Sequence, residues 1–152
     1  MIEFESVAKV YDGQRQALSD VNFRLAPGEM AFLTGHSGAG KSTLLRLILG
    51  LETASSGTVR VAGADLSTLS GEKLARYRRR VGVVFQDPNL EEDLSVFDNV
   101  ALPLRISGFN ESEIPKRVKA ALSRVDLSDQ AGASPKVLSG GQQQRIGIAR
   151  AI

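Results

Sequence analysis

The chain of 152 residues contains no cysteine and no tryptophan, and only one histidine and two tyrosines. Without cysteine, neither a disulfide framework nor a thiolate metal site can form, so nothing in the composition favours secretion. No apolar run approaches the roughly 18 residues of a membrane-spanning helix, because Arg46 interrupts the longest one. The segment from Met1 to Glu5 is acidic where a signal peptide would be basic. We therefore expect a cytoplasmic protein whose association with a membrane would come through a partner.

Charge is nearly balanced, with 19 basic and 17 acidic residues, and 42% of the residues are hydrophobic, as in a single globular domain. Much of the positive charge lies at 73–80, in Lys73, Arg76, Arg78, Arg79 and Arg80. Such a segment can bind nucleic acid or an acidic membrane surface, but it is more commonly the solvated face of a helix. No nucleic-acid-binding motif accompanies it, which favours the solvated helix.

The most informative stretch follows the apolar run 30–34 and reads Gly35-His36-Ser37-Gly38-Ala39-Gly40-Lys41-Ser42. Glycine, four residues and then Gly-Lys-Ser is the fingerprint of a phosphate-binding loop. The glycines let the main chain turn its amides inward, where a Cβ would intrude. Lys41 supplies a charge for the β and γ phosphates, the Ser42 hydroxyl can ligate Mg²⁺, and a helix starting at Gly40 adds the positive end of its dipole. The alternative is an ordinary glycine-rich turn between a strand and a helix.

Apolar periodicity predicts an α/β protein. Half-exposed strands are expected at 2–10, 17–25 and 58–61, with a turn at Tyr11-Asp12-Gly13. Two unbroken apolar runs, 30–34 and 81–85, predict parallel strands that are covered on both faces. Gln86 ends the second run, where ligands collect in open α/β sheets, so its amide oxygen could hold Mg²⁺ or the attacking water. The alternative is a surface amide at a strand end.

Helices are expected at 43–49, 70–80 and 112–125. The last would have Ser112 as its cap and Pro115 in its first turn, and a capping box at Ser95–Asp98 predicts the start of a further helix. Residues 88–135 therefore form a mostly helical lobe. Near the end, Leu138-Ser139-Gly140-Gly141-Gln142 has the Ser-to-Gln spacing of a capping box, which is by itself only a helix start. Two glycines in a first turn cost stability, but they leave main-chain amides bare enough to approach a phosphate.

Tyr11 is one of only two tyrosines and the chain has no tryptophan, so it is one of few candidates for stacking on a base. An exposed ring beside a phosphate-binding loop can stack on a purine base. A packing role is equally compatible with the residues alone.

The loop at 35–42, Gln86 and the pentapeptide 138–142, in this order and separation, resemble the ATP-binding cassette (ABC) ATPases, whose signature motif is that pentapeptide. Within the family, further segments look like the ATP-binding proteins of bacterial cell division, namely 31–43, 85–87 and 98–104. The resemblance covers the whole chain. It implies an α/β fold, a P-loop NTPase (RecA-like) with a parallel-sheet core, an antiparallel β edge and an inserted helical subdomain. The implied parts are the nucleotide-binding core at 1–87, the helical subdomain at 88–137, and the signature motif with the start of its helix at 138–152.

Site roles follow from the resemblance, position by position. Tyr11 would stack on adenine, and Ser42 and Gln86 would hold Mg²⁺, with Gln86 also positioning the attacking water. The residues expected to hold the rest of the ATP are Gly35, His36, Ser37, Gly38, Ala39, Gly40, Lys41, Ser42 and Thr43. The residues expected to contact the ATP of a second protomer are Leu138, Ser139, Gly140, Gly141 and Gln142. His36 belongs to the loop, so we do not interpret it as a metal ligand or a base.

The resemblance also implies partners. Because the signature residues serve the ATP of another protomer, the active site would form only in a head-to-tail homodimer. The segment 90–104 would receive a transmembrane partner and so keep the protein, as a peripheral subunit, at the cytoplasmic face of the bacterial inner membrane. ATP would then drive a cell-division complex, with no nucleic acid involved. The alternatives are an ATPase subunit for lipoprotein release or efflux, and a DNA-repair or chromosome-organising ABC ATPase, which only the basic segment 73–80 supports.

The sequence departs from the family pattern at its end. The family continues with an apolar strand ending in Asp-Glu, whose Glu is the catalytic base, and then with a switch histidine. This chain stops at Ile152 inside the signature helix, and its only histidine is His36. We therefore expect a fragment of a longer ATPase that binds ATP but does not hydrolyse it at the family rate. A non-catalytic nucleotide-binding scaffold is the remaining interpretation.

Overall fold

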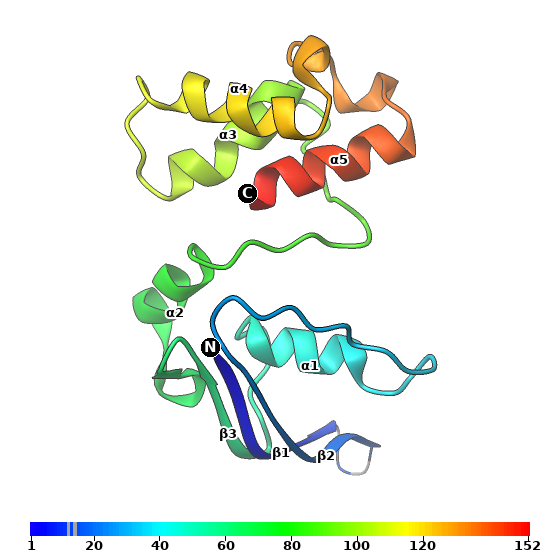
Figure 1. Cartoon of the computed structure of the whole chain (residues 1–152), viewed down its shortest axis with the longest axis vertical. Coiled ribbons are helices and arrows are strands. Elements are labelled where there is room, and N and C mark those ends of the chain that lie inside the picture. Colours follow the sequence, from blue (N-terminus) through cyan, green and yellow to red (C-terminus); the bar gives the residue numbers. More distant parts are fainter. Residues whose placement is uncertain (12, 14) are drawn as a thin grey trace. The chain divides into compact units, whose positions relative to one another are not determined.

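The computed structural model of the chain describes residues 1–11, 13 and 15–152. These residues form two compact units, Met1–Arg78 and Arg79–Ile152 (Figure 1). The turn expected at Tyr11-Asp12-Gly13 includes Asp12, which lies outside the described residues. The three-part division at 1–87, 88–137 and 138–152 stays a prediction.

The first unit is built on an antiparallel sheet with the strand order β2-β1-β3-β4. The strands are β1 (Ile2–Tyr11), β2 (Arg15–Leu25), β3 (Ser56–Val61) and β4 (Ala64–Asp65). This confirms the strands predicted from alternation. The pairing of β1 with β2 shifts in register between Lys9 and Val10, because Lys9 faces Leu18 while Val10 faces Gln16. Ala17 is the extra residue at this β-bulge.

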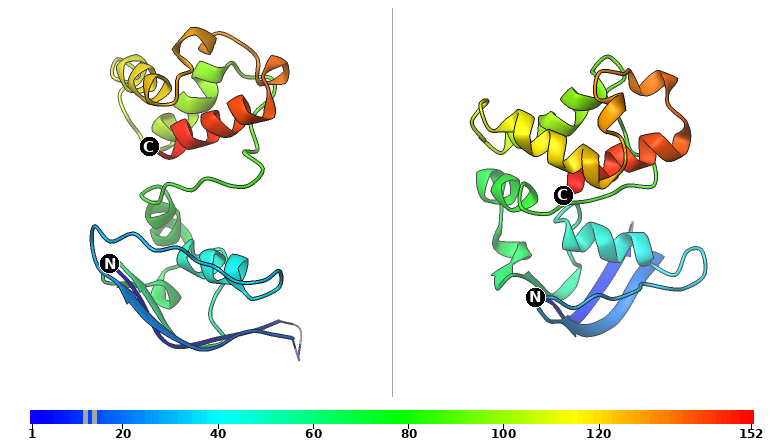
Figure 2. Two further views of the ribbon diagram at one scale, coloured as in Figure 1. Left: turned by 45° about the vertical axis from the view of Figure 1, so that its right-hand side comes forward. Right: turned by 45° about the horizontal axis from the view of Figure 1, so that its top comes forward.

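One helix, α1 (Lys41–Ile48), lies along one face of this sheet (Figure 2). Its buried residues Leu44 and Leu47 lie three apart, as the apolar face of a helix requires. They share a core with residues from the strands and the following turn, namely Phe4, Val7, Leu18, Val59 and Leu66. The predicted helix at 43–49 is thus confirmed, with its N-cap at Gly40.

The basic segment forms α2 (Gly71–Arg78), which contacts the C-terminal end of α1. The Tyr77 hydroxyl donates to the carbonyl of Ile48, and Arg78 donates to the carbonyls of Leu49 and Gly50. No amide of α1 bonds to these carbonyls, since the C=O groups at the end of a helix have no partner within it. The helix predicted at 70–80 is confirmed, and two of its arginines have partners within the unit, Arg78 on these carbonyls and Arg76 on the Glu72 carboxylate.

The second unit is a small helical bundle of α3 (Val96–Ile106), α4 (Ile114–Arg124) and α5 (Gly140–Ala151), with short 3₁₀ turns between α4 and α5 (Figure 1). Its core is formed by Val96, Val100, Ala101, Ile114, Val118, Leu122, Val125, Leu127, Leu138, Ile146 and Ala149. The mostly helical character predicted for 88–135 is confirmed. The predicted cap at Ser112 is wrong: the N-cap is Glu113, whose amide donates to the carbonyl of Asn110. Pro115 lies in the first turn of the helix, as predicted.

The two strands predicted at 30–34 and 81–85 do not form. Both segments lie outside helices and strands, and none of their residues is buried, with 80% of Met30, 83% of Phe32 and 49% of Phe85 exposed. A strand needs a neighbour to bond its amides and carbonyls. Within the described part of the chain, the only sheet is the four-stranded one above, and neither segment pairs with it. Apolar character alone therefore did not determine a strand.

Candidate functional site

The predicted phosphate-binding loop has the backbone conformation that its glycines allow. Gly35, Gly38 and Gly40 have φ angles of 149°, 83° and 89°, all in the region that favours glycine. Gly40 is the N-cap of α1. The loop therefore ends where the first free N–H groups of a helix begin.

Gly40 is also held by contact with the sheet. A Cβ at this position would lie 2.4 Å from the carbonyl oxygen of Ala17 and 2.8 Å from the Leu18 side chain. Ala17 is the bulged residue of β2, so the bulge and the glycine meet at the start of α1. The position accepts no side chain, and it fixes the loop against the sheet.

The Lys41 side chain folds back over the loop. Its ammonium donates to the carbonyl oxygens of Gly35 at 2.6 Å and His36 at 2.7 Å. A hollow of about 400 Å³ is lined by Ser37, Gly38, Gly40, Lys41 and Ser42. In the described part of the chain, Ala39 is the only residue of 35–42 whose main-chain amide donates to a protein acceptor, the carbonyl of His36. The hollow therefore presents donors: free amides, a hydroxyl and an ammonium.

Tyr11 stands at the end of β1, the strand whose residue Val7 is buried beneath α1. The ammonium of Lys9 lies 5.0 Å from the centroid of the Tyr11 ring. Residues two apart share a face of a strand, so Val7, Lys9 and Tyr11 continue one series. The structure thus places Tyr11 in the same unit as the loop, on the sheet face that carries α1.

The signature pentapeptide opens α5 in the second unit. Ser139 is the N-cap, and both arms of its capping box with Gln142 are present, at 2.8 Å and 3.3 Å. A Cβ at Gly140 or Gly141 would meet no atom within 4 Å, and neither residue has a left-handed φ. Neither local packing nor backbone conformation requires glycine here. Both glycines leave the first turn of α5 open.

Two glutamines that the sequence analysis did not single out brace this turn. Gln143 donates to the carbonyls of Pro135 at 2.9 Å and Leu138 at 3.2 Å, and Gln144 donates to the carbonyl of Phe85 at 3.0 Å. The signal available in the sequence was the unbroken run of three glutamines at 142–144. Its first member caps the helix and the others fix the segments on either side.

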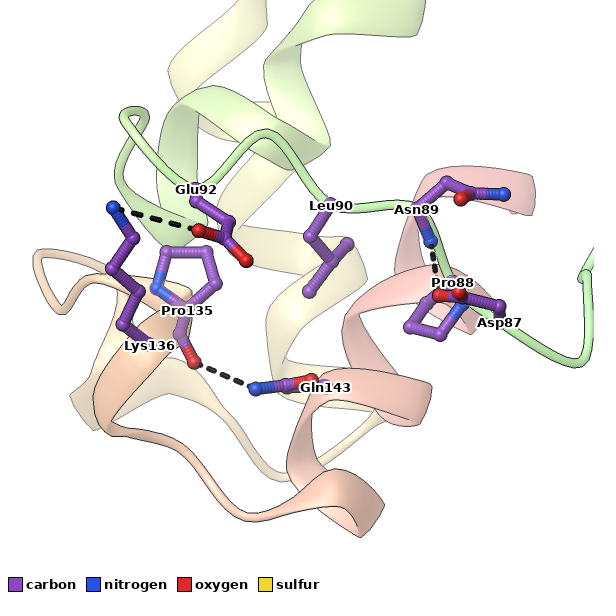
Figure 3. Close-up of a pocket in the computed structure, with 8 residues that line it drawn as sticks. All are labelled: Asp87, Pro88, Asn89, Leu90, Glu92, Pro135, Lys136 and Gln143. Carbon is purple, nitrogen blue, oxygen red and sulfur yellow. Dashed lines mark hydrogen bonds and ion pairs between the residues drawn. The ribbon is translucent and has the colours of Figure 1, made fainter.

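A second hollow, of about 210 Å³, lies within the helical unit (Figure 3). Its lining residues come from the segment before α3, from the 3₁₀ turn Pro135–Val137 and from the first turn of α5, and they are Asp87, Pro88, Asn89, Leu90, Glu92, Pro135, Lys136 and Gln143. Lys136 pairs with Asp93 at 3.4 Å and with Glu92 at 3.5 Å, and these carboxylates, Asp93 most of all, raise its pKa. The hollow is therefore a polar site with one cation and adjoining carboxylates.

Gln86 is exposed and lies in the second unit, between α2 and α3, while Ser42 is the second residue of α1 in the first unit. Their joint role toward Mg²⁺ stays a prediction. The described residues contain no group of three or more histidine, cysteine or acidic side chains suited to a metal. Among the described helices, none combines the length and the apolar character needed to span a bilayer.

Comparison with known proteins gives concordant results. Residues 18–152 match the family described as ABC transporter. The chain is 54% identical over its full length to the cell division ATP-binding protein FtsE of Escherichia coli (strain K12), and covers 68% of that protein. It is 47% identical over its full length to the methionine import ATP-binding protein MetN of Clostridium acetobutylicum, and covers 47% of that protein.

A solved structure of the ATP-binding cassette MJ0796, a dimer in a post-hydrolysis state bound to ADP and Pi, matches the whole chain. The TM-score is 0.91 at 36% identity, and the chain covers 69% of that cassette. This similarity confirms the predicted fold class, of which the described residues contribute the antiparallel edge, the loop with α1, and the helical part. The chain belongs to the ABC transporter family, as an ATP-binding protein of that family.

Proposed function

We propose that the chain binds the triphosphate of ATP in the loop at 35–43. The observation that carries this is the hollow around Gly38, Lys41 and Ser42, whose polar groups are free amides, a hydroxyl and an ammonium. An amide or ammonium donates and cannot accept, so the ligand must be rich in acceptor oxygens. The Lys41 ammonium donates to two loop carbonyls, and phosphate oxygens would take the place of these carbonyls as its acceptors. The cassette MJ0796, with ADP and Pi bound, supports this assignment.

The base and the metal complete the site as follows. Tyr11 offers a ring on the sheet face that carries α1, and the purine would stack on it. Ser42, the second residue of α1, would ligate Mg²⁺ together with phosphate oxygens, and Gln86 would contribute its amide oxygen. Bound Mg²⁺ would neutralise charge on the β and γ phosphates, while Gln86 would orient the attacking water. The protein's part is positioning.

The signature turn would serve the nucleotide of a second copy. Ser139 and the bare glycines Gly140 and Gly141 expose the first amides of α5 with nothing within 4 Å of either glycine's Cβ position. Free amides and the positive end of a helix dipole attract a phosphate. We therefore place the γ-phosphate of the partner's ATP against this turn, in a head-to-tail homodimer. Glycine at both positions would be kept for that approach, since the chain's own packing does not need it.

A transmembrane protein resembling FtsX would dock on the segment 90–104. The hollow lined by Asn89, Glu92 and Lys136 adjoins this segment and offers both charges to a partner side chain (Figure 3). Identity of 54% to FtsE, over the whole of this chain and 68% of FtsE, supports a role in bacterial cell division, with the protein peripheral at the cytoplasmic face of the inner membrane. The similarity to MetN supports the second candidate, the ATPase subunit of an importer or another transporter. Purification of the intact protein with its membrane partner distinguishes them, because an importer permease in place of an FtsX-like protein overturns the cell-division assignment.

Removal of the lysine ammonium tests the nucleotide site. We expect Lys41→Ala to lower the affinity of the intact protein for ATP at least tenfold, since the loop loses its only ammonium. The matched control is Lys73→Ala, which removes an exposed lysine of α2 and should leave the affinity unchanged. Titration of a fluorescent ATP analogue measures both. Equal affinities for Lys41→Ala and the wild type would contradict the assignment.

A further inference from the structure

Lys9 is placed to hold the aromatic ring that the proposed function assigns to the base. Its ammonium lies 5.0 Å from the centroid of the Tyr11 ring, a distance within the range of cation–π contacts. Only 13% of the Lys9 side chain is exposed, which is unusual for a lysine. Its burial is compensated by the Glu52 carboxylate at 3.0 Å and by the Thr53 carbonyl at 2.8 Å. The cation is therefore fixed in place and desolvated on one side.

The groups that fix Lys9 are themselves fixed to α1. The amides of Leu51 and Glu52 donate to the carbonyl of Arg46 in the last turns of the helix, at 2.9 Å and 3.3 Å. Three residues after Glu52, Ser55 bonds to β1 on both sides of Lys9: its amide donates to the carbonyl of Ala8, and its hydroxyl accepts from the Val10 amide at 3.0 Å. A continuous set of bonds thus runs from the end of α1 through Glu52 and Lys9 to the ring of Tyr11.

The N-terminal end of α1 packs against the residue that faces Lys9 in the sheet. Lys9 faces Leu18 across the β1–β2 pair, and Leu18 is one of the two residues against which Gly40 packs. The positions of the phosphate-binding loop and of the Tyr11 ring therefore both depend on Lys9 and its neighbours. The loop packs through Gly40 on Leu18, which faces Lys9, and the ring contacts the Lys9 ammonium. Figure 2 shows α1 lying along these strands.

We propose that Lys9 is a positioning residue that sets the base affinity of the site. Held by Glu52 and the Thr53 carbonyl, its ammonium covers one face of the Tyr11 ring and fixes the ring's orientation. The opposite face is left for the purine, at a set distance from the loop. Lys9 touches neither phosphate nor base. This inference rests on the proposed function, since it needs Tyr11 to be the base platform.

The test separates the base from the phosphates by using two ligands with Mg²⁺, ATP and inorganic tripolyphosphate. In the intact protein, Lys9→Met should weaken ATP binding about three- to tenfold, the value of a partly buried cation–π contact, and leave tripolyphosphate binding unchanged. Lys9→Arg, which keeps a cation, should retain most of the ATP affinity. The matched control is Arg60→Met, which removes the cation of the 2.7 Å pair with Glu5 on the same sheet and should change neither ligand.

Tyr11→Ala separates this inference from the proposed function. Support consists of a selective loss of ATP affinity in Tyr11→Ala and no further loss in the double variant with Lys9→Met. Unchanged ATP affinity in Lys9→Met beside a loss in Tyr11→Ala overturns the role of Lys9 alone. Equal losses of both ligands in Lys9→Met also overturn it, because they indicate a general structural effect. Unchanged ATP affinity in Tyr11→Ala overturns the base platform, and failure of the wild type to bind tripolyphosphate overturns the loop assignment.

Discussion

Alanine in place of Gly40 tests whether the start of α1 is locked against the sheet as the structure indicates. The substitution has two costs. An L-residue at a φ of 89° pays about 1–2 kcal/mol for the left-handed conformation. The new Cβ would also lie 2.4 Å from the Ala17 carbonyl oxygen, and such overpacking costs about 1–3 kcal/mol. We expect the free energy of unfolding to fall by about 2–5 kcal/mol.

Gly38→Ala separates these two costs. Gly38 has nearly the same φ, 83°, but a Cβ there would meet no atom within 4 Å. Gly38→Ala should therefore pay only the cost of the left-handed conformation, and Gly40→Ala should be the less stable variant by about 1–3 kcal/mol. Equilibrium urea denaturation without nucleotide measures both. If Gly40→Ala proved no less stable than Gly38→Ala, the contact between the loop and the β2 bulge would be refuted.

Two predictions concern the helical unit. Asn99 is fully buried, and its side chain bonds to the amide and the carbonyl of Glu91. In urea denaturation, Asn99→Ala should therefore lower the free energy of unfolding by about 1–3 kcal/mol. The control Asn110→Ala, at an exposed position, should have little effect. The Ser95 hydroxyl and then Arg105 lower the pKa of Asp98, so this carboxylate stabilises the fold above its ordinary pKa, and the contribution is lost as the pH falls through the lowered value. Thermal melts below about pH 4 should therefore show a shallower decline in Asp98→Asn than in the wild type, and parallel declines would contradict the assignment.

Local patterns predicted much of the fold because their causes are local. Alternation placed β1 and β2, and the spacing of Ser139 and Gln142 predicted a capping box whose two bonds are both present. The loop glycines were expected to let the main chain turn as other residues cannot, and Gly35, Gly38 and Gly40 all have positive φ angles. Each of these features depends on residues within a few positions of one another.

Features with distant causes were not predictable. The runs 30–34 and 81–85 are apolar enough for buried strands, but a strand forms only beside a partner, and no periodicity identifies one. The bulge at Ala17, which receives Gly40, depends on register between two strands. Lys9 was overlooked because its anchor, Glu52, is 43 positions away along the chain. The only indication in the sequence was the two-residue spacing of Lys9 and Tyr11, which places both on one face of a strand.

The central claim is that Lys41 of one copy and Gly141 of another close on the same ATP. Gly141→Ala places a methyl group in the open space at the first turn of α5, and Lys41→Ala removes the loop ammonium. In a head-to-tail dimer, a mixture of the two variants contains one site with both residues intact. Analytical ultracentrifugation with a non-hydrolysable ATP analogue and Mg²⁺ should show each variant alone as a monomer and the mixture as a dimer. Association of Gly141→Ala by itself, or none in the mixture, would contradict the shared site.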